Sequence, residues 1–392
     1  MKIVFFAHPL FLGSQSMPRF VGMLADGMKS RGYEVEVWRP EALFSAKINS
    51  FKKWMGYIDQ YVVFPQQVKR RLKDDNGEVL YVVTDHALGP YVPLIADRPH
   101  VIHCHDFLAQ RSALGEIPEN MTSATGRAYQ SYIKKGYSKG KNFISVSEKT
   151  RKDLGSFLKE VPKRSEMVYN GINTAFQPQE VEASRNLLSE KLDLALNEGY
   201  ILHVGGNQWY KNRVGVIEIY DAWRAKYGKQ LPLLLVGQQP NASLKLKYEA
   251  SPYKNDIHFL KNITDEEVKM AYSGASAFLF PSIAEGFGWP IAEAMASATV
   301  VVTTNAAPML EVAGDAAFLI GRKPSVKAEQ QQWAEGAAEV LDRALSLTAE
   351  QREEWINKGR ENVARFKLDD ALDQIEKIYS SVYINDKTKI SL

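Results

Sequence analysis

Residues 285–293 read Glu-Gly-Phe-Gly-Trp-Pro-Ile-Ala-Glu, with a carboxylate at each end and a Gly-Phe-Gly turn and a proline between them. An apolar, strand-like run (277–281) precedes this stretch and a helix-like run (291–296) follows it. Proline is well tolerated in the first turn of a helix, where its missing N–H would have no partner anyway. Glycines let a loop backbone approach a ligand closely. The stretch therefore predicts a strand, a glycine loop and a helix start, with Glu285 on the loop and Glu293 in the first helical turn.

A helix start of this kind can hold an anion, because its first N–H groups have no partner within the helix and the helix dipole favours negative charge there. A pyrophosphate bound at this point would leave the two carboxylates to accept hydrogen bonds from sugar hydroxyls on either side. The stretch therefore predicts a nucleotide-sugar site. The alternative is that Glu293 only complements the helix dipole.

The string Glu-x7-Glu, with Gly-Phe-Gly after the first glutamate and Glu-Ala-Met at the second, resembles the retaining glycosyltransferases of family 4, which have the GT-B fold of two Rossmann-like domains. The likeness continues in segments 280–282, 311–317, 170–173 and 204–212. A bare Glu-x7-Glu is a weak pattern, whereas the string with its flanks is specific. The resemblance is dense over residues 200–320 and loose before residue 100.

The composition is typical of a globular protein, with 45% hydrophobic and 24% charged residues. A chain of 392 residues is long enough for about two domains. Cys104 is the single cysteine, which excludes an internal disulfide and suits a reducing compartment. No apolar run reaches the roughly 18 residues of a transmembrane helix, and the apolar start of the chain is interpreted as a first strand, not a signal peptide. We therefore expect a cytoplasmic protein.

Charge is unevenly distributed along the chain. Residues 1–185 contain 26 Lys and Arg against 19 Asp and Glu, a net charge of +7, and the remainder has a net charge of −4. A basic first half fits an anionic partner such as a phosphorylated acceptor or a membrane surface, to which the protein would bind peripherally. An ordinary solvated surface is the alternative, and the pattern does not indicate nucleic acid.

Strand-like and helix-like runs alternate along the whole chain, which predicts an α/β fold with parallel sheets. Each half carries about six strands, so we expect two doubly wound, Rossmann-like domains with a cleft between them. The expected strands are 2–7, 34–38, 79–83, 100–103, 142–146, 166–169, 200–204, 231–236, 257–259, 277–280, 300–303 and 317–319. The expected late helices are 333–347, 350–366 and 369–383, and the polar tail 385–392 is expected to fray.

A polar stretch around Pro178, residues 175–190, is the expected domain boundary. We therefore place a first domain at residues 1–185 and a second at 186–366. The resemblance implies that the first domain binds the acceptor and the second binds the nucleotide-sugar donor. It also implies that the last helix, within residues 367–392, packs back onto the first domain.

The resemblance assigns roles to several residues of the glycine-rich string. Glu293 is implied to bind the ribose hydroxyls, and Glu285, with the backbone of Gly286, Phe287 and Gly288, is implied to bind the donor sugar and diphosphate. Further donor contacts are expected at loop residues and beside the base, namely Gly13, Gly206, Asn207, Gly237 and Ile263. Asn170-Gly171 is either a ligand-facing strand end or a plain turn.

Lys211 follows a predicted strand and precedes a helix-like run, 214–226. A lysine there can neutralise the charge that grows on a leaving diphosphate, and an exposed surface lysine is the alternative. The resembled family has an arginine a few residues earlier, but here Asn207-Gln208-Trp209-Tyr210 contains none and Arg213 follows the lysine. Either Arg213 replaces that arginine or one phosphate contact is missing.

No Asp-x-Asp pair occurs in the sequence, so a metal clamp on the diphosphate is not indicated. We therefore expect no metal and no other cofactor, as the resemblance also implies. Lys211 and the helix start would then carry the charge of the diphosphate.

His103-Cys104-His105-Asp106 lies at the end of a predicted strand. On an extended segment the two histidines share one face and Cys104 opposes them, so the segment does not wrap a zinc ion. The resemblance implies that His105 faces the reacting sugar, as a catalytic residue together with Lys211 and Glu285. His103 is better explained as a packed strand histidine, and Asp106 either contacts the acceptor or caps the next helix.

Residues 44–73 combine six aromatic side chains with seven Lys and Arg. Such a segment can face a membrane, which would suit a lipid-linked acceptor. It can also be a helix whose aromatic side chains pack on the sheet. We favour the second interpretation, because aromatic stripes at helical spacing are mostly buried.

These features predict a retaining, metal-independent transfer of a hexose from a nucleoside diphosphate sugar, UDP-linked before GDP-linked, to a hydroxyl of a saccharide or lipid-linked acceptor. An epimerase or a phosphorylase on a similar scaffold is disfavoured by Lys211 with Glu-x7-Glu and by the lack of a large cofactor domain. An inactive relative that binds a nucleotide sugar or a partner protein is the other alternative, supported by the missing arginine. Dehydrogenases and P-loop enzymes lose support because neither Gly-x-Gly-x-x-Gly nor Gly-Lys-Ser/Thr occurs.

Overall fold

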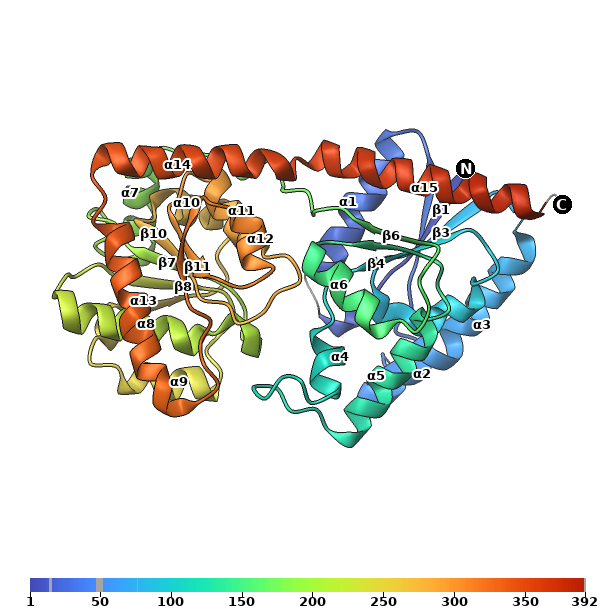
Figure 1. The fold of residues 1–392 in the computed structure, drawn as a ribbon, viewed down its shortest axis with the longest axis horizontal. Helices are drawn as coiled ribbons and strands as arrows, with labels where there is room; N and C mark the ends of the chain where they lie inside the picture. The colour runs from blue at the N-terminus through green and yellow to red at the C-terminus, as the bar shows by residue number, and fades with distance from the viewer. Residues whose placement is uncertain (14–15, 47–51, 76, 391–392) are drawn as a thin grey trace. The chain divides into compact units, whose positions relative to one another are not determined.

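The computed structural model describes residues 1–13, 16–46, 52–75 and 77–390. It divides into two compact units, which are described separately (Figure 1). The first unit comprises Met1–Ile117, Met121–Tyr169 and Asp369–Leu392. The second comprises Pro118–Asn120 and Asn170–Leu368.

The first unit contains a six-stranded parallel sheet in the order β2-β1-β3-β4-β5-β6. Its strands are β1 (Lys2–Phe6), β2 (Glu34–Trp38), β3 (Val79–Val83), β4 (His100–Cys104), β5 (Asn142–Ser145) and β6 (Arg164–Met167). All residues of β3, β4 and β5 are buried, as expected of parallel strands covered on both faces. The strand order runs outward from β1 in both directions, which defines a doubly wound sheet.

Helices and short turns of the first unit connect these strands. They are η1 (Leu10–Leu12), α1 (Ser16–Ser30), α2 (Lys52–Ile58), η3 (Asp59–Val63, a π-helical turn), α3 (Phe64–Arg71), η4 (Leu72–Asp74), η5 (His86–Leu94), α4 (Leu108–Ala113), α5 (Ala124–Tyr137) and α6 (Glu148–Phe157). In α1, Phe20, Leu24 and Met28 recur at helical spacing and are almost fully buried. This stripe anchors α1 on the sheet.

The last helix, α15 (Leu368–Ile390), belongs to the first unit over nearly its whole length (Figure 1). Asp373 accepts a hydrogen bond from Arg31 at 2.6 Å, and the hydroxyl of Tyr33 donates to Glu376 at 2.8 Å. Leu372 packs so closely on Gly27 that a Cβ there would lie 2.7 Å from it. The expectation that the final helix crosses back onto the first domain is therefore confirmed.

The second unit contains another six-stranded parallel sheet, in the order β12-β11-β10-β7-β8-β9. Its strands are β7 (Ile201–Val204), β8 (Leu233–Val236), β9 (Ile257–Leu260), β10 (Ala277–Phe280), β11 (Val301–Thr304) and β12 (Ala317–Ile320). Its helices and turns are α7 (Val181–Leu192), η6 (Trp209–Lys211), α8 (Arg213–Tyr227), α9 (Ala242–Ala250), η7 (Lys254–Asp256), α10 (Asp265–Gly274), α11 (Trp289–Ala296), α12 (Met309–Ala313), η8 (Lys327–Glu329), α13 (Gln330–Leu345), α14 (Ala349–Val363) and η9 (Ala364–Phe366). One face of the sheet forms a hydrophobic core with α8, α9 and α13.

The twelve expected strands are confirmed, with ends displaced by at most two residues. Two expectations about segment limits are wrong. The polar stretch 175–190 is not the boundary, because the second unit begins at Asn170 and α7 occupies most of that stretch. Leu188 is buried on α7, and Arg185 of the same helix donates to the carbonyl of Gly274 at 2.9 Å. Because few residues of α7 are buried, its sequence is mostly polar. A polar sequence of this kind is easily mistaken for a linker between domains.

The second correction concerns the tail, which was expected to fray from residue 385. The last helix extends to Ile390 instead. No glycine or proline occurs in residues 385–392 to end the helix. A polar composition alone therefore did not predict where the helix ends.

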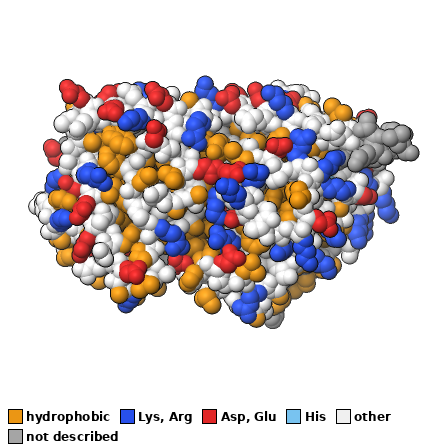
Figure 2. Space-filling model, in the orientation of Figure 1, with side chains coloured by type: hydrophobic (Ala, Val, Ile, Leu, Met, Phe, Trp, Pro, Cys, Tyr) orange, Lys and Arg blue, Asp and Glu red, His pale blue; other side chains and the backbone are white. Residues whose placement is uncertain are grey.

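The aromatic side chains of residues 44–73 divide into two groups. Phe64 is buried against Tyr91, with ring centroids 4.9 Å apart. Trp54 and Phe44 are 66% and 45% exposed, so the expectation that the aromatic residues pack on the sheet is wrong for these two. Lys and Arg side chains are prominent over the region of α3 in Figure 2, and the last turn of this helix contains Lys69, Arg70 and Arg71. Phe51 lies outside the described residues, and no described helix is long and apolar enough to cross a membrane.

Candidate functional site

The carboxyl ends of parallel strands are where open α/β sheets bind ligands. In the second unit, β10, β7 and β8 are neighbours in the sheet. The segments that follow these three strands contain Gly286, Gly206 and Gly237, respectively. Most of the predicted donor-binding residues therefore gather at one edge of this sheet, although they are spread over some eighty residues of sequence.

Lys211 and Glu285 form an ion pair, with Lys211 Nζ 2.8 Å from Glu285 Oε1. Their side chains are only 14% and 8% exposed, so the alternative of an exposed surface lysine is wrong. Ser282 is fully buried and its hydroxyl lies 2.6 Å from the same carboxylate oxygen. The N–H of Ile283 donates to the carbonyl of Tyr210 at 2.7 Å, which joins the segment after β10 to the segment that carries the lysine. A fixed cation and a fixed carboxylate therefore lie side by side at the ends of β7 and β10.

Two loops meet at the end of β7 and β8. Gly237 has φ of 140°, and a Cβ at this position would lie 2.2 Å from the carbonyl oxygen of Gly205. Only glycine fits such an approach. The N–H of Asn207 donates to the side-chain oxygen of Gln238 at 3.2 Å. Within the described part of the chain, the N–H of Gly206 has no hydrogen-bond partner, so it is available to a ligand.

Glu293 is the fifth residue of α11, and the expectation that it lies in the first turn is wrong. Helix-dipole effects fall off within the first turn, so the dipole alternative loses support. The hydroxyl of Tyr272 donates to Glu293 Oε2 at 3.0 Å. Burial, together with this carboxylate, raises the pKa of Tyr272 well above its usual value, so the hydroxyl stays a donor. Tyr272 therefore orients the carboxylate expected to bind ribose.

The start of α11 has the predicted form. Gly288 precedes the helix with φ of 107°, no side chain caps it, and Pro290 lies in the first turn. The side chain of Phe287 is buried edge-on against Phe366, at 5.4 Å between ring centroids. Only the backbone of this residue can therefore face a ligand.

Three other predicted positions lie outside the loops that follow β7, β8 and β10. Ile263 follows β9, between Asn262 with φ of 56° and Thr264, which caps α10. Gly13 ends η1 of the first unit in the left-handed conformation, and the residues after it, 14–15, lie outside the described part of the chain. Gly171 belongs to a tight crossing, where its Cβ would lie 2.6 Å from Leu368. Residues 170 and 171 do not form a turn, so the plain-turn alternative is wrong, and the close approach of Leu368 is the structural reason for a glycine here.

Arg213 begins α8 and is 4% exposed. Its Nη1 donates to the side-chain oxygen of Asn207 at 2.6 Å and to the carbonyl of Gln238 at 2.8 Å. Burial lowers the pKa of Arg213 to about 10, which still leaves the guanidinium charged at neutral pH. This arginine therefore lies beneath the loops that follow β7 and β8, and does not project from them.

In the first unit, His105 follows β4 and its Nε2 lies 2.9 Å from the carbonyl oxygen of Thr84. A carbonyl can only accept, so we assign the proton to Nε2 and leave Nδ1 as a lone pair. Phe20 contacts the ring edge-on at 4.4 Å, and burial lowers the pKa of His105. Asp106 accepts the N–H of Leu108, the first residue of α4, at 2.9 Å, but the N-cap residue of this helix is Phe107.

His103 is a buried strand histidine, as predicted, and its Nε2 lies 2.6 Å from the hydroxyl of Tyr379 on α15. Asp85 was not predicted from the sequence; it accepts a hydrogen bond from His8 Nε2 at 2.9 Å. Nδ1 of His86 also lies 3.0 Å from this carboxylate. His8 and Asp85 lie just after the carboxyl ends of β1 and β3, which the sequence predicts as apolar strands. A polar residue at the end of a predicted strand was therefore the signal that could have revealed both.

Ser282 and Tyr272, which donate hydrogen bonds to Glu285 and Glu293, were not predicted from the sequence either. Ser282 belongs to the Phe-Pro-Ser flank of the resemblance, so its position was noticed but its role was not. Tyr272 lies on a different helix, and no local pattern marks it. Within the described residues, no group of three His, Cys, Asp or Glu side chains is arranged to hold a metal ion.

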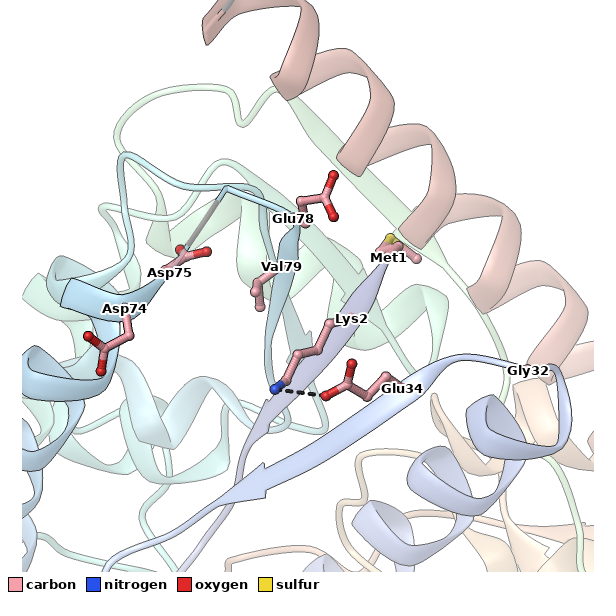
Figure 3. Close-up of a pocket in the computed structure, with 8 residues that line it drawn as sticks. All are labelled: Met1, Lys2, Gly32, Glu34, Asp74, Asp75, Glu78 and Val79. Atoms are coloured by element: carbon pink, nitrogen blue, oxygen red, sulfur yellow. Dashed lines mark ion pairs between the residues drawn. The ribbon is translucent and has the colours of Figure 1, made fainter.

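A pocket of about 480 Å³ lies elsewhere, at the amino ends of β1, β2 and β3 (Figure 3). Lys2 projects into it and pairs with Glu34 at 2.9 Å, and Asp74, Asp75 and Glu78 also line it. Ligands of open α/β sheets bind at the opposite, carboxyl edge. We therefore do not assign this pocket to the candidate site.

Two doubly wound units, a glycine loop between two carboxylates and a buried lysine define a GT-B glycosyltransferase. Family comparison agrees with this class. Residues 17–176 match the family model "Glycosyltransferase Family 4", and residues 184–362 match "Glycosyl transferases group 1". The chain belongs to the family 4 glycosyltransferases of the GT-B fold.

Curated relatives include O-antigen chain mannosyltransferase B of Escherichia coli, 32% identical over 124 residues, which are 31% of this chain and 32% of the relative. O-antigen chain mannosyltransferase RfbU of Salmonella typhimurium is 24% identical over 60% of this chain and 59% of its own length. The matched part of the chain thus spans about a third of the length of mannosyltransferase B and about three fifths of the length of RfbU.

Two solved structures illustrate the shared fold. Sucrose-phosphate synthase from Thermosynechococcus elongatus matches with a TM-score of 0.75 at 16% identity, over 98% of this chain and 100% of that one. Anabaena Alr3699/HepE, solved with UDP and glucose, matches with a TM-score of 0.69 at 16% identity, over 97% of this chain and 100% of that one. At this identity the likeness concerns the fold alone.

Proposed function

We propose that this protein transfers a hexose from a nucleoside diphosphate sugar to a hydroxyl of a saccharide or lipid-linked acceptor. The observation that carries the proposal is the buried Lys211–Glu285 ion pair beside the glycine loop. A cation held at this edge can stabilise the charge of the leaving diphosphate, while the carboxylate accepts hydrogen bonds from sugar hydroxyls. Mannose is the hexose that the names of the curated relatives favour.

The roles of the other residues follow from their positions. Glu293, oriented by Tyr272, would bind the ribose, and the backbone around Gly206 and Gly288 would receive the diphosphate. The first unit would bind the acceptor, with His105 facing the sugar. A UDP-linked donor is our first choice and a GDP-linked donor the second.

We further propose that the reaction retains the configuration of the sugar and needs no metal. Lys211 supplies a fixed positive charge where a metal ion would otherwise be needed. The acceptor would attack from the face that the diphosphate leaves, and a diphosphate oxygen would take the hydroxyl proton.

The protein would act in the cytoplasm. The exposed Trp54 and Phe44 and the basic region around α3 would be its contact with a membrane surface.

One experiment tests the donor site directly. Thermal unfolding is measured without metal, in the presence of UDP, GDP, ADP and their glucose and mannose conjugates. A ligand at about 100 times its dissociation constant stabilises the native state by roughly 2.7 kcal/mol. We expect one base to raise the unfolding midpoint of the wild type and not that of Glu293→Ala.

The matched control is Glu353→Ala, which removes an exposed glutamate of α14 and should respond like the wild type. If no nucleotide shifts the wild type, the donor site is wrong. An inactive relative, the alternative that the missing arginine supports, would show a nucleotide shift but no transfer to any acceptor.

A further inference from the structure

Helix α8 contains two buried arginines in different electrostatic surroundings. Arg224 is 8% exposed, pairs with Asp256 at 2.5 Å and donates to the hydroxyl of Tyr220 at 2.7 Å. Arg213 is 4% exposed, and within the described residues no carboxylate lies within ion-pair distance of it. Among the described residues, its Nη1 donates only to neutral oxygens, and its buried Nε and Nη2 have no partner. One buried charge is therefore compensated and the other is not.

An uncompensated buried charge is expensive, because burial removes the water that solvates it. The ring of Phe259, whose centroid lies 5.7 Å from the guanidinium carbon, offers only partial relief. Because the guanidinium remains protonated at neutral pH, deprotonation does not remove the cost. A fold that keeps such a charge is poised to receive an anion.

The position of Arg213 indicates where that anion would bind. Its Nη1 contacts Asn207 and the carbonyl of Gln238, which belong to the loops after β7 and β8. The unpartnered N–H of Gly206 lies on the first of these loops. Lys211, by contrast, already has Glu285 as its counter-charge.

A buried histidine lies close to both cations. His203 is fully buried, and its Nδ1 donates to the carbonyl of Leu279 at 2.9 Å. Its Nε2 has no partner in the part of the chain that the structure describes. A Cβ on Gly205 would lie 3.0 Å from that Nε2. Burial lowers the pKa of His203 to about 3 against the hydrogen bond to the carbonyl of Leu279, and the charges of Arg213 and Lys211 lower it further. A Cβ on Gly205 would also lie 3.5 Å from Cδ of Lys211.

We propose that Arg213 is the second cation of the donor site and attracts the diphosphate through the Gly205–Asn207 loop by its charge. This inference rests on the proposed function, and it supplies the positive charge of the arginine that the sequence lacks before Lys211. Arg213 is too buried to touch the ligand directly in the described conformation. It is therefore a positioning residue that acts through the loop above it.

A purely structural role makes a different prediction. If Arg213 only joins the two loops, its two Nη1 hydrogen bonds matter and its charge does not. Arg213→Gln keeps an N–H donor and removes the charge, whereas Arg213→Lys keeps the charge on a shorter, unforked side chain. The two variants therefore separate the alternatives.

The test uses inorganic pyrophosphate, UDP, GDP and the nucleosides uridine and guanosine as probes, with thermal shift and calorimetry as readouts. We expect Arg213→Gln to bind pyrophosphate and the preferred diphosphate at least about tenfold more weakly than the wild type. Arg213→Lys should retain most of the affinity, and nucleoside binding should be unchanged in both variants. Arg224→Gln is the matched control, and it should lose stability but keep the wild-type affinity for pyrophosphate.

The outcomes distinguish this inference from the proposed function. If Arg213→Gln binds pyrophosphate and the diphosphate as tightly as the wild type, Arg213 only joins the two loops and the inference is wrong. If Arg213→Gln weakens nucleoside and diphosphate equally, a general disturbance of the loops explains the result and the inference also fails. If none of the probes binds to the wild type, both the proposed donor site and this inference are wrong.

Discussion

At the scale of single residues, the candidate site consists of charged groups whose orientation depends on neutral neighbours. Glu285 receives both the ammonium of Lys211 and the hydroxyl of Ser282 on the same oxygen. Glu293 receives the hydroxyl of Tyr272. A carboxylate oriented in this way loses little entropy when substrate binds, because its rotamer is already selected.

Ser282→Ala tests this orientation of Glu285. Loss of the hydroxyl should reduce the free energy of unfolding by about 1 kcal/mol and should lower sugar transfer while nucleotide binding persists. Ser297→Ala is a matched control, because Ser297 is equally buried but its hydroxyl has no partner. Unfolding in urea and kcat/KM for transfer are the measurements. Equal effects of the two substitutions would contradict the role of Ser282.

The buried histidines predict a dependence of stability on pH. Burial lowers the pKa of both His103 and His203 to about 3, whereas an unfolded histidine has a pKa of about 6.5. Between these values the unfolded state binds protons that the folded state does not, so stability falls as the pH drops from about 6.5 toward 3. Each such histidine contributes a slope of up to about 1.4 kcal/mol per pH unit.

The measurement is urea unfolding at several pH values between 7 and 5, for the wild type and for His103→Asn. The variant should lose stability less steeply as the pH falls. Asp85, whose two histidine neighbours help to lower its pKa against the effect of burial, acts below about pH 4 and does not interfere. Parallel pH dependences of variant and wild type would show that His103 does not contribute.

At the scale of secondary structure elements, the site depends on loops that close strands β7, β8 and β10. Gly237 has a backbone conformation that other residues rarely adopt, and it lies against the carbonyl of Gly205. The first loop is tied to the second by Asn207, whose side chain donates to the carbonyl of Gln239 at 2.5 Å. The shape of the candidate site at the carboxyl edge of the sheet therefore depends on close backbone contact between the loops that follow β7 and β8.

Gly237→Ala should push these loops apart, because the added Cβ collides with the carbonyl of Gly205 and the backbone angle is strained. We expect a loss of about 1–3 kcal/mol in stability and weaker nucleotide binding. Gly336→Ala is the control, since Gly336 lies within α13 with no atom near its Cβ position. That substitution should stabilise the protein by up to about 1 kcal/mol. The prediction fails if Gly237→Ala binds nucleotide like the wild type.

At the scale of the whole molecule, the C-terminal helix completes a unit whose other parts come from the first half of the chain. Leu372, Ile375, Tyr379 and Val382 of α15 are buried in that unit. The hydroxyl of Tyr379 reaches His103 in the middle of the first sheet, at 2.6 Å. The first unit therefore cannot bury its sheet without the end of the chain.

Tyr379→Ala should lower the free energy of unfolding by about 3–5 kcal/mol, the usual effect of removing a large buried aromatic side chain. Ile384→Ala on the same helix is the control, because Ile384 is 62% exposed and its removal should change stability little. Thermal and urea unfolding measure both variants. A loss no larger for Tyr379→Ala than for Ile384→Ala would mean that α15 does not support the first unit.

The sequence by itself determined the elements and the class of the protein. Strands such as 79–83 and 277–280 are continuous apolar runs, because both faces of a parallel sheet are covered, and such runs are readable without any partner. The glycine string around Glu285 was readable for the same reason, since its turn and helix start are local. The arginine missing before Lys211 was equally visible.

Only the tertiary structure decided which residues are neighbours. Lys211 and Glu285 meet because sheet order places β10 beside β7, and strand order depends on crossovers between distant segments. Tyr272 and Glu293 meet because α10 and α11, on either side of β10 in the chain, contact each other. Tertiary contacts also decide the position of α7. This helix has a polar sequence with few buried residues, and its contact with α10 shows that it belongs to the second unit. The isolation of Arg213 from any carboxylate is likewise a property of packing, because charge compensation depends on distance in space and not on spacing in sequence.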